Sequence, residues 1–571
     1  MADWLWLPPG VYPGRQSTKY SCMLPDGETN YTVCEFRRVC DFGGRAISSV
    51  EIEASGDTAF ILFEKNRQIL RGPVWVGGDF LFNDERPPEF YSTRCSFAPE
   101  EPAAPFELRA LVRMGSVRIC EYSRGEGGFF LRGTVFFEDG GSEAIETDGS
   151  WRGRLLGAYT APYSYDGNVA PGEFEAPSLS TGPVETIAAP IPPCEVSPLP
   201  VEGLGFTEHG AGKSSRETEL DKVYACYVSV RVSGAPARVK LTGYELPGGS
   251  DFAYDLDFTG PGEYHGMELH AVGGVRIELE KPTPGDTSVS AELLASSYPT
   301  PYRAMTVTSD AELDLVLDVC AHSLKYCRQS IHLDSPKHCE PLACTGDYYI
   351  ETLMTAFTYG DMRLAAFDVR RTALRLNRHD GRIFHTSYSL IWALMLWDVY
   401  MLTGERRLLS DCRGALDRLL ARFDGYLGEN GLIETPPDYM FVDWLDPDGI
   451  NLHHPPKALG QTCLCMFYFG ALRTAEKIYR ELGDEASARG CFEKSAALRE
   501  ACLSNLWDAE RGLFFEGLNT PTPEELLNNY MPANVGKRYY RRHANILAAY
   551  FGFFGSRPAG TASHTGDSAD A

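Results

Sequence analysis

Three acidic residues, Asp334, Glu340 and Asp347, share one short stretch of the chain. Carboxyl groups held close together can donate protons, accept them or bind the hydroxyl groups of a sugar. Pro336 and Pro341 lie in the same stretch and argue against one continuous helix. We therefore expect an irregular loop on a rigid scaffold, which is a common setting for an active site.

Each acid also has a structural interpretation that stays open at this point. Asp347 precedes an apolar helical pattern and could cap that helix. Asp334 precedes Ser335 and Pro336 and could begin a turn. Glu340 precedes a proline and does not lie on a helix surface, so a structural role explains it least well.

The elements that position this loop follow from two periodicities. The first 300 residues or so contain short alternating runs separated by Gly- and Pro-rich turns, as at 32–39, 59–64, 228–232 and 275–279. Many short strands with such turns predict β-sandwiches. This part is long for one sandwich, so we expect two, with a break near residue 160.

From Ser309 onward the pattern is helical. Ser309 and Glu312 form a predicted capping box, and apolar residues follow at helical spacing. Further helices are predicted at 348–359, 362–376, 387–402, 406–427, 458–482, 485–506 and 543–554. Paired helices with short connections indicate an array of helical hairpins or a toroid.

Composition excludes several classes of protein. Hydrophobic residues make up 43% and charged residues 23% of the 571 residues, which excludes wholesale disorder. A net charge of −25 argues against nucleic-acid binding. No apolar run is long enough for a membrane span, and the N-terminus does not resemble a secretory signal. The 16 cysteines have no disulfide-framework spacing, so we expect reduced thiols and a cytoplasmic location.

The loop resembles the catalytic signature of glycoside hydrolase family seventy-eight, the bacterial α-L-rhamnosidases. Asp334-Ser335-Pro336 matches its start, Glu340 its acid and Thr345-Gly346-Asp347 its end. Two features depart from the family pattern: Pro341 replaces the usual Arg, and Ala343-Cys344 replaces the usual Gly-Trp.

The resemblance covers about residues 30 to 555. Its further segments are Asp57–Gly72, Thr147–Trp151, Ser309-Asp310 with Leu313, Trp392–Tyr400 with Thr403-Gly404, Phe441–Trp444 and His543–Asn545. It implies N-terminal β-sandwich domains followed by an (α/α)6 toroid catalytic domain that is incomplete in this chain. The expected limits are 1–160 for an accessory, carbohydrate-binding-like sandwich, 161–303 for a second sandwich, 304–555 for the partial toroid and 556–571 for a disordered tail.

The resemblance also implies an activity, namely inverting hydrolysis of terminal α-L-rhamnosides in small molecules or oligosaccharides. Glu340 would be the general acid, and repulsion among three acids would help it keep its proton. The residues expected to bind substrate are Asp334, Asp347, Asp443, Trp444 and Trp392. No cofactor, metal, nucleic acid or membrane is expected, and a homodimer is left open.

The general base that the resemblance implies is not found in the sequence. The family's general base is a Glu in an aromatic-rich segment after the His543-type helix, whereas residues 555–571 are small and polar. We therefore expect a truncated chain. Two alternatives stay open: a glycan-binding remnant without hydrolysis, and a six-hairpin glycosidase for another terminal sugar. His338, Cys339 and Cys344 suggest a metal site, but no second Cys/His pair lies at zinc spacing.

Overall fold

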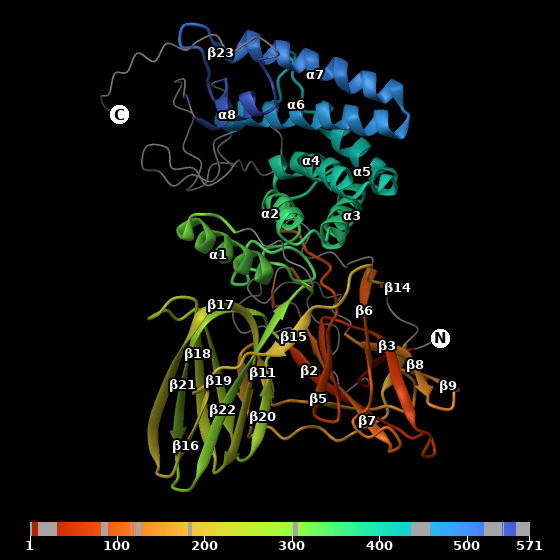
Figure 1. Ribbon diagram of the computed structural model, residues 1–571, viewed down its shortest axis with the longest axis vertical. Helices are drawn as coiled ribbons and strands as arrows, with labels where there is room; N and C mark the ends of the chain where they lie inside the picture. Colours follow the sequence, from red (N-terminus) through yellow and green to blue (C-terminus); the bar gives the residue numbers. More distant parts are fainter. Residues whose placement is uncertain are drawn as a thin grey trace. The chain divides into compact units, whose positions relative to one another are not determined.

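The computed structural model divides into two compact units, residues 1–371 and 372–571 (Figure 1). It describes residues 3–8, 31–80, 89–115, 117–118, 120–121, 127–180, 185–300, 307–434, 457–518, 540 and 542–554. The first unit holds both strand-rich regions and the loop with the three acids. The first unit also contains the helices at 311–327 and 345–358, the helix at 363–378 crosses the boundary, and the later helices lie in the second unit.

The first strand-rich region is a β-sandwich, as predicted. Its larger sheet has the order β13-β1-β8-β3-β6-β14 with β9 beside β8, and its smaller sheet the order β10-β2-β7-β4-β5. The core between them includes Phe36, Leu62, Val50 and Phe129. The strands are β1 (Trp4–Trp6), β2 (Thr32–Cys40), β3 (Ile47–Gly56), β4 (Ala59–Glu64), β5 (Arg67–Gly72), β6 (Glu89–Phe97), β7 (Phe106–Met114), β8 (Phe129–Phe137), β9 (Ser142–Glu146), β10 (Arg152–Leu155), β13 (Ser178–Ser180) and β14 (Glu185–Ala188).

The second strand-rich region forms one ten-stranded sheet, ordered β11-β12-β19-β18-β21-β17-β22-β15, with β16 beside β22 and β20 beside β17. The long strand β17 pairs with β21, β22 and β20, and its register with β21 shifts between Glu219 and Tyr224. Strands β13 and β14, beyond residue 160, pair with β1 and β6 of the first sandwich. The strands are β11 (Tyr159–Ala161), β12 (Ser164–Asp166), β15 (Glu195–Pro198), β16 (Gly205–Glu208), β17 (Gly212–Gly234), β18 (Ala237–Tyr244), β19 (Phe252–Phe258), β20 (Gly262–His265), β21 (His270–Lys281) and β22 (Thr287–Ser297).

Helices begin at residue 311, close to the predicted change of pattern. In the described residues they are α1 (Ala311–Cys327), α2 (Thr345–Thr358), α3 (Arg363–Arg378), α4 (Thr386–Thr403), α5 (Arg406–Asp424), α6 (Lys457–Leu482), α7 (Glu485–Asn505) and α8 (Arg542–Tyr550). A short hairpin of β23 (Trp507–Asp508) and β24 (Leu513–Phe514) follows α7. None of the described helices is both long and apolar enough to cross a membrane.

Two details of the predicted first helix are wrong. The N-cap of α1 is Asp310, not Ser309, because the Asp310 carboxylate accepts hydrogen bonds from the backbone N–H groups of Glu312 and Leu313. The predicted apolar stripe is only partly buried: Leu324 is buried, whereas Leu313 and Val316 are exposed.

In the second unit, α6 and α7 run side by side (Figure 1). Gly404 ends α4 in the left-handed conformation, with φ of 68°, as expected for a glycine placed just after a helix. The predicted helical hairpins are therefore present in this part of the chain.

Candidate active site

The loop between α1 and α2 begins at a buried histidine. The ring of His332 is fully buried, with Nδ1 2.8 Å from Asp368 Oδ2 and Nε2 3.1 Å from Thr355 Oγ1. Asp368 also accepts a hydrogen bond from Arg371. Since Asp368 and Arg371 lie on α3 and Thr355 on α2, the start of the loop is fixed to both helices.

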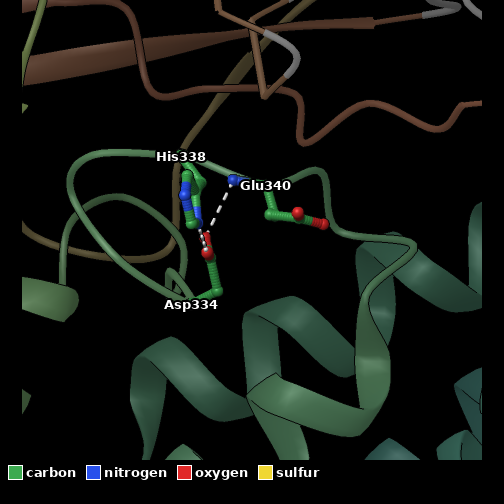
Figure 2. A group of neighbouring side chains, drawn as sticks. All are labelled: Asp334, His338 and Glu340. Carbon is green, nitrogen blue, oxygen red and sulfur yellow. Dashed lines mark hydrogen bonds and ion pairs between the residues drawn. The ribbon is translucent and has the colours of Figure 1, made fainter. Parts of the chain in front are cut away.

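Asp334 organises the loop that carries Glu340. Its Oδ1 accepts a hydrogen bond from the backbone N–H of Glu340 at 3.1 Å, and its Oδ2 lies 2.9 Å from the His338 ring (Figure 2). The Ser335 hydroxyl also donates to Oδ2, at 3.3 Å. Asp334 thus closes a turn, as its structural interpretation expected, and it determines where Glu340 lies.

The Glu340 carboxyl is half-buried and points away from the Asp334–His338 pair (Figure 2). The Cys344 thiol donates a hydrogen bond to its Oε2 at 2.7 Å. Burial raises the pKa of Glu340, and the negative charge of Asp334 raises it further, whereas the Cys344 thiol and His338 lower it. The net effect is upward, so this carboxyl keeps its proton to a higher pH than an exposed glutamate.

Tyr348 fixes the backbone on the other side of the acid. This buried side chain is placed by the first turns of α2, and its hydroxyl lies 2.6 Å from the carbonyl oxygen of Glu340 and 2.7 Å from that of Pro341. The backbone of Glu340 is therefore held at its N–H by Asp334 and at its carbonyl by Tyr348.

Asp347 is not the cap of α2. The N-cap of α2 is Cys344, and its side chain makes no capping bond. Asp347 is half-buried in the first turn, where the helix dipole favours a negative charge. Its interpretation as an N-cap is therefore wrong.

A fourth acid, Glu351, lies one turn further along α2. It is 7% exposed, and its Oε2 has no hydrogen-bond partner among the residues that the structure describes. Burial raises the pKa of Glu351 well above its usual range, and the charges of Asp347, Asp334 and Asp368 add to the effect. We did not predict Glu351; its spacing of four residues from Asp347 is the signal that could have identified it.

The strand-rich part of the first unit supports the loop. The backbone N–H of Leu342 donates to the carbonyl of Gly77 at 2.5 Å. Gly77 has φ of +108°, and a Cβ at this position would lie 2.8 Å from the Leu342 side chain, so only glycine fits. Arg118 donates to the carbonyl of Lys337 at 3.0 Å. The segments around residues 77 and 118 thus contact the loop on both sides of Glu340.

Three further residues were predicted to bind substrate. Trp392 lies on α4 with a fully buried side chain, so contact with a sugar would require the ring to become accessible. Asp443 and Trp444 lie outside the described residues. The site that the structure describes consists of Asp334, Glu340, Asp347, Glu351 and Cys344.

Within the described residues, one group of side chains could hold a cation. Asp334, His338 and Glu340 bring potential ligand atoms within 4.8 Å of one another. The sequence suggested His338, Cys339 and Cys344 as possible metal ligands. The group in the structure shares His338 with that set but includes neither cysteine. A carboxylate bound to a cation could not also carry a proton, so the acid role of Glu340 and a metal site would compete.

Comparison with protein families finds one match in the helical region. Residues 303–563 match the family described as the bacterial alpha-L-rhamnosidase 6 hairpin glycosidase domain. No curated protein sequence matches the chain.

Several solved structures resemble most of the chain. The GH78 family rhamnosidase of Bacillus sp. GL1 aligns with a TM-score of 0.69 at 12% identity, over 97% of this chain and 80% of its own. The alpha-L-rhamnosidase from Dictyoglumus thermophilum gives 0.62 at 16%, over 89% and 60%. The Streptomyces avermitilis alpha-L-rhamnosidase complexed with L-rhamnose gives 0.59 at 15%, over 85% and 50%. At these identities the likeness shows the fold: strand-rich domains followed by a helical domain.

Proposed function

We propose that the chain is a glycoside hydrolase that releases terminal α-L-rhamnose, because residues 303–563 match the bacterial alpha-L-rhamnosidase 6 hairpin glycosidase domain. The substrates would be rhamnosylated small molecules or oligosaccharides. The observation that carries this proposal is the half-buried Glu340 carboxyl, which accepts a hydrogen bond from Cys344 and whose pKa is raised by burial.

Glu340 would act as the general acid. A glycosidic oxygen is a poor leaving group unless it is protonated as the bond breaks. A proton donor must remain protonated at the working pH, and burial beside Asp334 raises the pKa of Glu340 in that direction. The contacts of its backbone with Asp334 and Tyr348 fix the carboxyl relative to the loop.

The proposed reaction inverts the configuration at the anomeric carbon. In this mechanism a second carboxylate about 6.5–9.5 Å from the acid activates water on the opposite face of the sugar. We do not assign this base to a described residue. Asp347 and Asp334 would bind sugar hydroxyls, and Asp334 would do so while it holds the turn.

The test is hydrolysis of aryl α-L-rhamnosides whose leaving groups differ in acidity. Glu340→Gln keeps the shape of the side chain but has no proton to deliver. We expect kcat/KM to fall by about 10²–10⁴-fold for poor leaving groups and much less for nitrophenolate. Proton NMR of the first sugar product would identify its anomer and so test inversion.

A matched control is Glu312→Gln on α1, which removes an exposed carboxyl from the same unit. It should leave every rate unchanged. An equal loss for all leaving groups in Glu340→Gln would contradict the acid role. A panel of nitrophenyl glycosides tests the sugar, and rhamnose binding without turnover would favour a glycan-binding protein instead.

A further inference from the structure

A polar pocket lies in the first unit, and none of its lining residues belongs to the loop with Glu340. Strands β2, β7 and β10 of the first sandwich and β11, β12 and β20 of the second strand-rich region contribute to its lining. Its volume is about 270 Å³, near the lower end for ligand pockets and suited to a single sugar ring. Its charged lining residues are Arg37, Arg109, Arg154, Glu35 and Glu263.

Three arginines meet at one buried carboxylate in this pocket. Glu35 is 2% exposed and accepts hydrogen bonds from Arg37, at 3.0 and 2.8 Å, and from Arg154, at 2.6 Å from Nε. Arg109 approaches the same carboxylate only to 3.7 Å. One negative charge is therefore shared among three guanidinium groups.

The strand register adds an unfavourable pair. Arg37 of β2 lies directly opposite Arg109 of β7. Like charges that face one another across a sheet destabilise it unless an anion lies between them. Glu35 supplies part of that negative charge, and its short contacts go to Arg37 and Arg154.

Of the three arginines, Arg109 is the one that donates no hydrogen bond to Glu35. Its side chain is only 14% exposed, and its guanidinium lies over the Phe63 ring at 4.1 Å. A guanidinium has five N–H donors, yet none of those of Arg109 makes a hydrogen bond to a residue in the described part of the chain. An acceptor from outside the chain would satisfy them.

The other charged groups around the pocket do not remove the excess of positive charge from the three arginines. Glu263 is paired with Arg231, and hydrogen bonding from His265 together with Arg231 lowers its pKa to about 2. Burial lowers the pKa of His265, which favours the neutral form of the ring. The Glu107 carboxylate lies 3.9 Å from Nη1 of Arg37, the nitrogen that makes no hydrogen bond to Glu35.

Aromatic rings complete the lining. Tyr165 is half-buried in the pocket wall, and Tyr159 packs edge-on against it with ring centroids 5.4 Å apart. The Phe174 ring lies 4.4 Å from the guanidinium carbon of Arg154 and 5.1 Å from that of Arg37. Aromatic faces suit the apolar face of a pyranose ring, and guanidinium groups suit a planar carboxylate.

We propose that this pocket binds a sugar unit that carries a carboxylate, such as a uronic acid within a saccharide. The carboxylate would accept hydrogen bonds from Arg109 and lie between it and Arg37, and the ring would pack against Tyr165. This site is independent of the proposed hydrolysis at Glu340.

The test compares two ligands that differ only at C6, methyl β-D-glucuronoside with a carboxylate and methyl β-D-glucoside with a hydroxymethyl group, by calorimetry and ligand-observed NMR with the full chain. The glucuronoside should bind, and its affinity should fall as salt rises. Arg109→Gln should weaken it by at least about tenfold, since one charge-assisted bidentate contact is lost. Arg109→Lys keeps the charge without the planar pair of donors. Its affinity for the glucuronoside should lie between those of the unsubstituted chain and Arg109→Gln.

Arg94→Gln is the matched control, because Arg94 pairs with Glu53 on another sheet and does not line the pocket. Its binding should match the unsubstituted chain, and rhamnoside hydrolysis should be unchanged in all these variants. Equal binding of both sugars, no binding of either, or full affinity in Arg109→Gln with an unaltered unfolding temperature would each overturn the proposal.

Discussion

The first unit contains two polar clusters with opposite charge patterns. In the acid loop, Glu340 lies near Asp334, and Glu351 lies near Asp347 on α2. The Glu340 carboxyl contacts the Cys344 thiol, and the Asp334 carboxylate contacts the His338 ring. In the arginine pocket, by contrast, one carboxylate serves three guanidinium groups.

The difference shows how partial burial acts on charge of either sign. Where carboxyl groups are crowded together, one of them is stabilised in its protonated form, which suits proton transfer. Arginine does not lose its proton in the same way, so a crowded set of guanidinium groups instead favours binding of an anion. One region is suited to chemistry and the other to recognition.

The largest expected effect comes from breaking the arginine pocket. Glu35→Gln leaves Arg37, Arg109 and Arg154 without their shared countercharge. We expect the free energy of unfolding to fall by about 2–3 kcal/mol, below the value for a fully buried pair because Arg37 and Arg154 are partly exposed. Urea denaturation measures this, with exposed Glu51→Gln on β3 as the control. An unchanged midpoint would mean that the arginines do not depend on Glu35.

The acid loop is tested by two substitutions with opposite expected signs. Asp334→Asn keeps an acceptor for the Glu340 N–H but removes the charge that raises the pKa of Glu340, so the alkaline limb of kcat/KM should move to lower pH. Cys344→Ala removes a hydrogen bond that lowers this pKa, so the limb should move to higher pH.

Cys344→Ser keeps a donor at the same position and should stay closest to the unsubstituted profile. The measurement is kcat/KM for an aryl rhamnoside across pH. Shifts of both variants in the same direction would show that Asp334 and Cys344 do not act on Glu340 through charge and hydrogen bonding.

The smallest expected effect concerns Glu351. Its folded pKa is raised, so above the usual carboxyl pKa the unfolded chain releases a proton that the folded chain retains, and stability falls as pH rises. Glu351→Gln removes this dependence and should raise the unfolding temperature at pH 8 by about 1–3 °C, with a smaller gain at pH 5. Calorimetry of this variant beside Glu312→Gln tests the sign. A greater gain at pH 5 would contradict it.

The sequence predicted the parts of the fold that depend on local pattern. Pro336 and Pro341 correctly indicated an irregular loop, and the helical periodicity placed α3 to α7 within a few residues of their ends. These features depend on backbone geometry and on which face of a helix is apolar.

Features that depend on pairing between distant strands could not be predicted. Glu35 and Arg37 share one face of β2 and resemble an ordinary solvated face, and only the register with β7 and β10 brings Arg109 and Arg154 to them. Glu351 resembles a charge on a helix surface until the packing of α2 is known. Trp392 lies in a segment that resembles the family, but its buried position follows from packing around α4.

The contact between Gly77 and Leu342 has a consequence for dissecting this protein. A fragment that begins at the helical region would lack the strand-side surface against which the acid-bearing loop is seated. If helical regions were exchanged between related proteins, each loop would contact a Gly77-type segment from a different protein. The two segments are therefore expected to be inherited, and to be engineered, as a single piece.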